Sequence, residues 1–148
     1  MARPKNPNLN FHNLLILVSK LRRKLDSQIE AEVHYRGFKN FKSSYLPIFL
    51  ILYKEGSTTV RIAEECGVTK QAISKLLLEM ANLGLIKTQV NKQDRRSSIV
   101  LLSAKGMKMA SEVRDCLANL TDNYKSLMGK GKYENLVELL EVLWILHE

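Results

Sequence analysis

The chain has 148 residues, of which 45% are hydrophobic and 26% charged, values typical of one globular domain or two small lobes that share a core. Its longest stretch without a charged residue, Asn6 to Ser19, is shorter than the roughly 20 residues of a membrane span, so we expect no membrane anchor. Cys66 and Cys116 form no C-x-x-C pair, and we expect a cytoplasmic protein. The net charge of +8 is unevenly distributed along the chain: residues 1–100 hold 17 Lys and Arg against 8 Asp and Glu, and residues 101–148 hold 6 against 7. The positive excess therefore favours a polyanion such as nucleic acid as the partner of the first two thirds of the chain.

Residues 8–34 show the periodicity of a long amphipathic helix. Apolar residues recur along it at spacings of three and four: Phe11, Leu14, Leu15, Val18, Leu21, Leu25 and Ile29. Its polar side carries Lys20, Arg22, Arg23 and Lys24, which we interpret first as a solvated face and only second as a contact surface.

A second apolar run, Tyr45 to Tyr53, predicts a short buried helix. Ser43 and Ser44 are candidates for its N-cap. Gly56 stands where a left-handed residue would end the helix.

Two short helices joined by a tight turn are expected next. Thr58 can cap the first, which stops near Gly67, and Thr69 can cap the second, from Lys70 to Leu83. Ala63 is small enough to let the two helices approach, and glycine permits the positive φ of the turn, so the pattern is that of a helix-turn-helix. The apolar residues expected to lock the helix angle are Ile62, Val68, Ile73 and Leu76.

The second helix of this pair leaves polar side chains outside, near its N-terminus. They are Lys70, Gln71, Ser74 and Lys75, to which we add the neighbouring Arg61 and Thr69 as DNA-binding candidates. Such groups can hydrogen-bond base edges and phosphates, and the helix N-terminus adds a partial positive charge, so the set suits a major groove. The alternative is an ordinary solvated helix face.

After Gly84 the pattern changes to that of strands. Leu85–Val90 and Ser98–Leu102 flank seven polar residues, which predicts a β-hairpin with a cationic tip. Packed after a helix-turn-helix, this hairpin would form a wing. The alternative is a solvated charged turn.

The strongest candidates for DNA contact in the wing are Arg95 and Arg96, since a guanidinium group is held well in a narrow, electronegative minor groove. Lys92 and Gln93 complete the set of candidates at the tip. Asp94 would be repelled by phosphate, so we expect it to orient the wing.

In these segments the chain resembles the MarR family of winged-helix transcription regulators. The resemblance is carried by Thr58-x-x-x-Ile62-Ala63, by Gly67–Ser74 and by Leu83–Ile86. Its most specific part is Asp94–Gly106, which matches the family's D-x-R wing, the L-[S/T] that follows and a glycine. The match is strong over residues 57–106, and the flanking helices agree in outline.

The resemblance implies a mainly α fold with a small β-wing. The winged helix-turn-helix lobe would cover residues 43–102, and the N-terminal helix, within 1–42, would join the C-terminal helices, within 103–148, in a dimerisation region. It further implies a homodimer that places its two lobes in successive major grooves of a palindromic operator in double-stranded DNA.

By the same resemblance, the outward side chains of the second helix contact bases or phosphates and Arg95 enters the minor groove. Arg96 would lie near phosphate and, with Asp94, shape the wing. Lys92 and Gln93 stand where many members have a proline and an arginine, so a shallower insertion is expected.

The last third of the chain predicts a dimer independently of the family. One apolar stripe follows Ser103, Gly129 and Gly131 break it, and a second stripe follows. The stripes consist of Met107, Ala110, Val113, Leu117, Leu120, Tyr124 and Leu127, and of Leu136, Leu139, Leu140, Leu143 and Leu146. Faces of this kind must be buried, either against a second copy or against the first helix of the same monomer.

The sequence favours neither an enzyme nor a cofactor or metal site, because its three histidines, His12, His34 and His147, are scattered. The side chains of His34, Tyr35, Phe41 and Tyr45 could line a pocket for a small aromatic or phenolic ligand, although such residues more often belong to a core. Cys66 and Cys116 are expected to be buried packing residues.

We therefore expect a dimeric, sequence-specific DNA-binding regulator, a repressor relieved by a small ligand. The alternatives are a winged-helix protein-interaction scaffold and an RNA-binding module. The cations of the wing disfavour the scaffold, which would prefer no DNA duplex, whereas RNA binding has the same charge signature as DNA binding.

Overall fold

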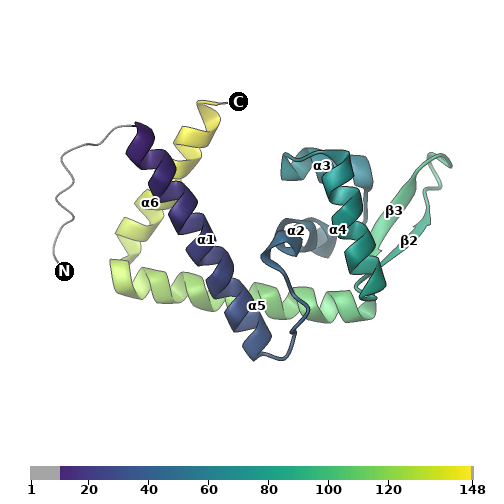
Figure 1. The fold of residues 1–148 in the computed structure, drawn as a ribbon, viewed down its shortest axis with the longest axis horizontal. Helices are drawn as coiled ribbons and strands as arrows, with labels where there is room; N and C mark the ends of the chain where they lie inside the picture. Colours follow the sequence, from purple (N-terminus) through teal and green to yellow (C-terminus); the bar gives the residue numbers. More distant parts are fainter. Residues whose placement is uncertain (1–10, 148) are drawn as a thin grey trace.

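The structure is a computed structural model that describes residues 11–147 of the chain. It is mainly helical with a small antiparallel sheet, as predicted, and this sheet has three strands (Figure 1). Its elements in chain order are α1 (Phe11–Tyr35), the 3₁₀ helix η1 (Ser43–Tyr45), α2 (Leu46–Lys54), β1 (Ser57–Thr58), α3 (Thr59–Cys66), α4 (Lys70–Asn82), β2 (Ile86–Val90), β3 (Ser98–Leu102), α5 (Ala104–Met128) and α6 (Lys130–Ile145). Within the described residues, none of the helices is long and apolar enough to cross a membrane.

The sheet combines the predicted hairpin with one strand that the sequence analysis missed. β2 and β3 pair from Ile86 opposite Leu102 to Val90 opposite Ser98, which confirms the hairpin. β1 adds Ser57 and Thr58 along β3, so the strand order is β1-β3-β2. Two residues are too few to show the alternation by which a strand is recognised in a sequence.

The predicted ends of α2 are wrong on both sides. Ser43 and Ser44 lie in the 3₁₀ turn and cap nothing; Tyr45 holds the N-cap position and makes no side-chain capping bond. The chain leaves α2 in an extended conformation at Glu55, and Gly56 has no positive φ. Gly56 is instead a point of close approach to β3, because a Cβ at this position would lie 2.6 Å from the side chain of Leu101.

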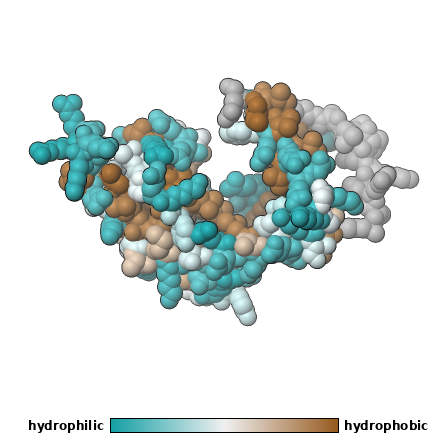
Figure 2. Space-filling model, turned by 180° about the vertical axis from the view of Figure 1, so that it is seen from behind, coloured by the Kyte–Doolittle hydropathy of each residue, from teal (hydrophilic) through white to brown (hydrophobic). Residues whose placement is uncertain are grey.

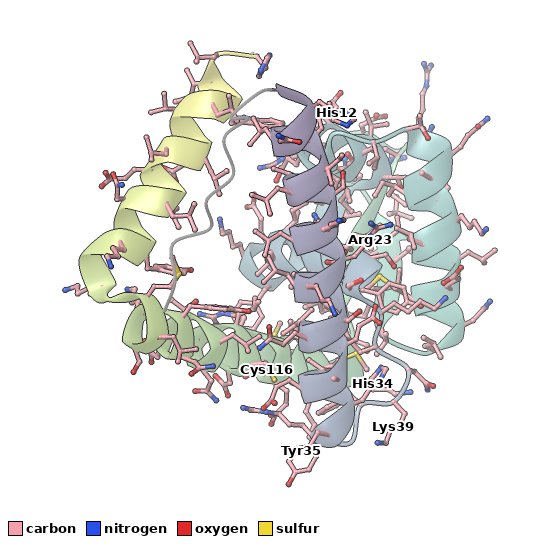
Figure 3. All side chains as sticks on the ribbon, turned by 60° about the vertical axis from the view of Figure 1, so that its left-hand side comes forward. His12, Arg23, His34, Tyr35, Lys39 and Cys116 are labelled. Atoms are coloured by element: carbon pink, nitrogen blue, oxygen red, sulfur yellow. The ribbon has the colours of Figure 1, made fainter. Side chains whose placement is uncertain are left out.

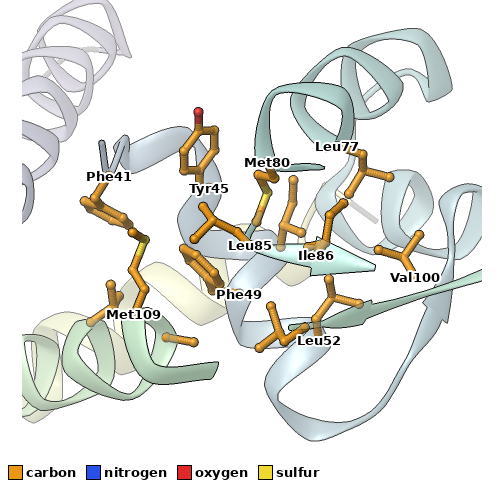
Figure 4. Packing of buried hydrophobic residues seen from close by; sticks show 14 of the residues in the cluster. Phe41, Tyr45, Phe49, Leu52, Leu77, Met80, Leu85, Ile86, Val100 and Met109 are labelled. Atoms are coloured by element: carbon orange, nitrogen blue, oxygen red, sulfur yellow. The ribbon is translucent and has the colours of Figure 1, made fainter. Parts of the chain in front are cut away.

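A single hydrophobic core joins the winged lobe to the end of α1 and the first half of α5 (Figure 4). The ring of Phe49 stacks with Phe41 at 6.3 Å and meets Tyr45 edge-on at 6.5 Å, measured between centroids. Met80 and Met109 pack into the same cluster. This core fixes α4 and the wing on the rest of the molecule.

The helices outside the lobe are joined at α5. Arg36 at the end of α1 donates to Glu112 of α5 at 3.0 Å, and the Tyr124 hydroxyl of α5 donates to Gln28 of α1 at 2.5 Å. α6 leaves α5 at Gly129, which has a φ of 88°. The further break predicted at Gly131 is wrong, since this residue lies within α6.

α6 is the most exposed helix of the described chain. None of its residues is buried, and its packing within the monomer is against α5. Brown, apolar side chains are accordingly visible at the surface of the arm that carries α6, across a hollow from the winged lobe (Figure 2). The apolar stripe of this helix is therefore not buried against the first helix of the same monomer.

Candidate nucleic-acid interface

The helix-turn-helix is built by the capping residues that the sequence predicts. The hydroxyl oxygen of Thr58 accepts a hydrogen bond from the Arg61 amide at 3.3 Å, and that of Thr69 accepts one from the Ala72 amide at 3.2 Å. Gly67 ends α3 in the left-handed conformation with a φ of 64°. These contacts fix where α4 begins and in which direction it leaves the turn.

Val68 does not lock the helix angle as predicted, since its side chain is 47% exposed. Its backbone closes the turn instead: the amide of Val68 donates to Ala63 and that of Gly67 donates to Glu64, both at 3.1 Å. Ile62 and Ile73, both buried, and the half-buried Leu76 supply the apolar contacts.

α4 presents two chemically distinct faces. Ile73, Leu77 and Met80 are buried in the core. The predicted DNA-contacting side chains are all exposed near the start of the helix: Lys70, Gln71, Ser74 and Lys75. A row of hydrogen-bonding and cationic groups therefore stands on a helix whose opposite face is held by packing.

A polar contact also anchors α4. Glu79 accepts hydrogen bonds from the Lys42 ammonium at 2.7 Å and from the Tyr45 hydroxyl at 3.1 Å. The hydrogen bond from Lys42 is the main cause that lowers the pKa of Glu79, and the same bond raises the pKa of Lys42. The sequence analysis missed this contact because Lys42 and Glu79 lie far apart in the chain.

The base of the wing is fixed by the residues that follow β3. Ser103 caps α5 by accepting from the Gly106 amide at 3.0 Å, and its hydroxyl donates to the Gly84 carbonyl at 2.6 Å. Lys105 donates to the Leu83 carbonyl at 2.6 Å. Ser103 and Gly106, the serine and glycine of the Asp94–Gly106 motif, thus have structural roles: they hold the segment after α4 against the start of α5.

The wing tip is held by its own side chains and backbone. Asn91 donates to the Ser97 hydroxyl at 2.9 Å and accepts from the Gln93 amide at 3.0 Å. The carboxylate of Asp94 accepts from the Arg96 amide at 3.0 Å, and its carbonyl accepts from Ser97. Asp94 therefore shapes the loop through the backbone. Asn91 was not among the predicted residues, although an asparagine opening a polar loop is a known turn signal.

The cations of the tip are exposed and not neutralised by a carboxylate of the described chain. Arg95, Arg96 and Lys92 are exposed, and none is ion-paired with a carboxylate within residues 11–147. Gln93 is exposed beside them. Figure 1 shows the β2–β3 hairpin extending from the lobe alongside α4, so both candidate surfaces belong to one lobe.

Arg61 differs from the other predicted contacts because its charge is engaged. Its guanidinium group lies 2.8 Å from the Glu65 carboxylate and 3.1 Å from that of Glu55. The hydrogen bond to Glu65 is the main cause that raises the pKa of Arg61. The spacing of four residues between Arg61 and Glu65 on one helix was a local signal for this pair.

The structure places three of the four residues predicted to line a ligand pocket close together and leaves Tyr35 apart. Phe41 and Tyr45 are core residues, 2% and 1% exposed, whereas Tyr35 is 86% exposed and points away from the molecule (Figure 3). One imidazole nitrogen of His34 is hydrogen-bonded with the Phe41 carbonyl at 2.8 Å.

The cysteines are placed as packing residues. Cys116 is fully buried and Cys66 is half-buried, and burial is the main cause that raises the pKa of both thiols. No group of three or more His, Cys, Asp or Glu among the described residues is placed to hold a metal ion.

A comparison with protein families finds a match over part of the chain. Residues 40–97 match the model of the MarR family. No curated protein matches the chain.

Solved structures share the fold over nearly the whole chain. A MarR transcriptional regulator from Methanosarcina mazei Go1 is 19% identical, with 90% of this chain and 94% of that one covered and a TM-score of 0.76. The S. aureus MepR–DNA complex is 17% identical, with 95% and 100% covered and a TM-score of 0.78. The PcaV transcriptional regulator from Streptomyces coelicolor, solved with its natural ligand, is 16% identical, with both chains fully covered and a TM-score of 0.77.

Proposed function

We propose that this chain, of which residues 40–97 match the model of the MarR family, is a transcriptional regulator of that family, not an enzyme, that binds double-stranded DNA through α4 and the wing. The observation that carries the proposal is the set of exposed polar and cationic side chains on two firmly supported elements of one lobe. MepR, whose fold this chain shares, was solved bound to DNA. Lys70, Gln71, Ser74 and Lys75 would contact bases and phosphates, and Arg95 and Arg96 would reach the minor groove and phosphates.

The neighbouring candidates have more limited roles in this proposal. Thr69 and Lys92 would contact phosphate, and Gln93 would hydrogen-bond at the edge of the wing contact. Asp94 would keep the tip in shape. Arg61 would reach phosphate only by giving up its bonds to Glu55 and Glu65, so we assign it a minor part.

We further propose that the regulator acts as a homodimer on a palindromic operator. The support is the apolar surface that one monomer leaves exposed on α1, on α6 and at the residue that caps α6, including Leu17, Leu139 and Leu146 at 63%, 58% and 75% exposure. Surfaces of this kind normally mark an interface. In a two-fold dimer the lobes would contact half-sites about 34–36 Å apart, one turn of DNA.

A dimer clamped on such a site blocks it for other proteins, so we propose repression as the outcome. Relief would come from a small ligand that changes the separation of the two lobes, since the operator fixes that separation. The S. coelicolor regulator with the same fold was solved with a natural ligand, which supports ligand control.

Selection of bound duplexes from a random DNA pool by the full chain tests the DNA-binding proposal. We expect one enriched, two-fold symmetric motif with half-sites about 10 base pairs apart, and an affinity that falls steeply with salt. No enriched motif, or equal binding to structured RNA, would overturn the proposal and favour the scaffold or RNA-binding alternatives.

Matched variants then assign the contacts. Arg95→Ala should lower affinity for the selected duplex about tenfold or more, and Gln71→Ala should broaden the preferred sequence. Arg23→Ala removes the same charge from an exposed site on α1 and serves as the control. Unchanged affinity for Arg95→Ala would remove the wing from the interface.

A further inference from the structure

One apolar side chain stands on the face of α4 that we propose to enter the major groove. Leu78 is 63% exposed, and within this fully described helix it is the one large apolar residue that is exposed. The others are buried or half-buried: Ile73, Leu76, Leu77 and Met80. The core therefore leaves most of the Leu78 side chain in water.

Helix geometry places Leu78 among the polar residues that are proposed to contact bases. Each residue of an α-helix turns by about 100°, so residues three, four or seven positions apart share a face. Leu78 follows Gln71 by seven positions and Ser74 by four, and Lys75 precedes it by three. The fully buried Met80 lies about 160° away from Leu78 around the helix. Leu78 is thus at the centre of the outward face.

The position of Leu78, and not its exposure alone, indicates a contact. Single exposed leucines are common on protein surfaces. On a face inserted into the major groove, however, Leu78 would lie against base edges. These edges present hydrogen-bond donors and acceptors, and their apolar group is the C5 methyl of thymine. Because leucine makes no side-chain hydrogen bonds, it would leave polar edges without partners, whereas contact with a thymine methyl buries apolar surface on both sides.

We propose that Leu78 is a specificity-determining residue that packs against the C5 methyl group of one thymine in each operator half-site. The inference rests on the proposed function, because it requires α4 in the major groove. An α-helix rises about 1.5 Å per residue, so Leu78 lies about 10 Å beyond Gln71 along the axis. For a helix that lies along the groove, this distance is about three base-pair steps. The thymine should therefore lie about three base pairs from the position at which Gln71→Ala broadens the preferred sequence.

The test replaces the thymines of the selected duplex by deoxyuridine, one at a time and in one half-site only. Deoxyuridine lacks the C5 methyl group and keeps every hydrogen-bonding group of thymine. Dissociation constants of the full chain are measured by fluorescence anisotropy at one salt concentration, since phosphate contacts make the affinity depend on salt. Replacement of the thymine at the stated position should weaken binding about fourfold, the effect of losing the burial of one methyl-sized apolar group.

Variants of Leu78 show whether this residue contacts the methyl group. Leu78→Ala should bind the thymine duplex and its deoxyuridine counterpart equally, because the apolar contact is absent from both complexes. Leu78→Met keeps an apolar side chain of similar volume and should retain the preference for thymine. Leu50→Ala is the control, since it removes the same atoms from a leucine of α2 that is 42% exposed, and it should retain the full preference.

The folding of α4 is checked on the same variants. Leu78 is exposed and alanine is the best helix former, so Leu78→Ala should keep the helical circular dichroism and the melting temperature of the parent chain. Leu78→Gln is a second variant, which keeps the length of the side chain but ends it in a polar amide. It should lose the preference for thymine as Leu78→Ala does.

Results that overturn this proposal differ from those that overturn DNA binding itself. The assignment of Leu78 is wrong if the selected half-site has no thymine at the stated position, if deoxyuridine there does not weaken binding, or if Leu78→Ala keeps the full preference for thymine. In each of these cases the parent chain still binds the selected duplex, so the DNA-binding proposal stands. A parent chain that selects no duplex overturns both.

Discussion

Gly106, at the base of the wing, leaves no room for a side chain. A Cβ on Gly106 would lie 1.8 Å from the carbonyl oxygen of Leu85, and this oxygen already accepts from the Ser103 amide at 3.0 Å. Because the obstacle is backbone, no side-chain rotation relieves the clash. The glycine of the motif is therefore required by the approach of α5 to the start of β2.

We expect Gly106→Ala to destabilise the chain by about 3 kcal/mol, the upper range for overpacking a buried site. Gly131→Ala is the matched control, since a Cβ there meets nothing within 4 Å and the residue lies in a helix. It should be neutral or stabilise by up to about 1 kcal/mol. Chemical denaturation of both variants measures the difference, and equal stabilities would contradict the assignment.

Residue roles were predictable from the sequence where they depend on near neighbours. Thr58, Thr69 and Gly67 act within a few residues of themselves, and all three were identified correctly. Gly56 and Val68 were misassigned, since their surroundings are set by β3 and by the backbone of the turn. Ser57 gave no signal, because its burial arises only when β1 pairs with β3.

At the scale of elements, α4 is held on the lobe by a contact that depends on pH. The folded chain lowers the pKa of Glu79 through the hydrogen bonds from Lys42 and Tyr45. A carboxylate with a lowered pKa stabilises the fold above its unfolded pKa, about 4.3, and this contribution is lost as pH falls through the lower folded value.

Glu79→Gln should therefore reduce stability modestly at pH 7, because the groups are exposed and screened by solvent. The gap between parent and variant should close as pH falls below about 4. Denaturant midpoints measured from pH 7 down to pH 3 test this. A gap that persists at the lowest pH would mean that the amide disturbs packing and that the charge is not the cause.

The order of elements was predictable because each carries a local pattern of adequate length. Both hairpin strands and the long helices followed from periodicity, and Ser103 caps α5 as expected. The exposure of the candidate groups on α4 and the wing was predictable, whereas their part in binding stays a prediction. The supports of the site, Glu79 with Lys42 and Lys105 with Leu83, were not predictable, since they join segments 22 or more residues apart.

For the whole molecule, the decisive feature is the apolar surface on the helices outside the lobe. α6 buries none of its residues in the monomer, although its stripe includes Leu136, Leu139 and Leu140. Exposed apolar area of this extent favours association, because burial removes it from water. A second copy would supply the cover and would also set the distance between the two winged lobes.

Leu139→Glu places a charge on this surface at a residue that is 58% exposed, so the monomer fold should persist while the dimer dissociates. Sedimentation should show the parent as a dimer and the variant as a monomer with unchanged helical circular dichroism. Leu78→Glu makes the same replacement on α4 at 63% exposure and should leave the dimer intact. Since each lobe would then contact only a half-site, Leu139→Glu should also lower affinity for a symmetric duplex. A dimer that survives this substitution would place the contact between copies on another surface.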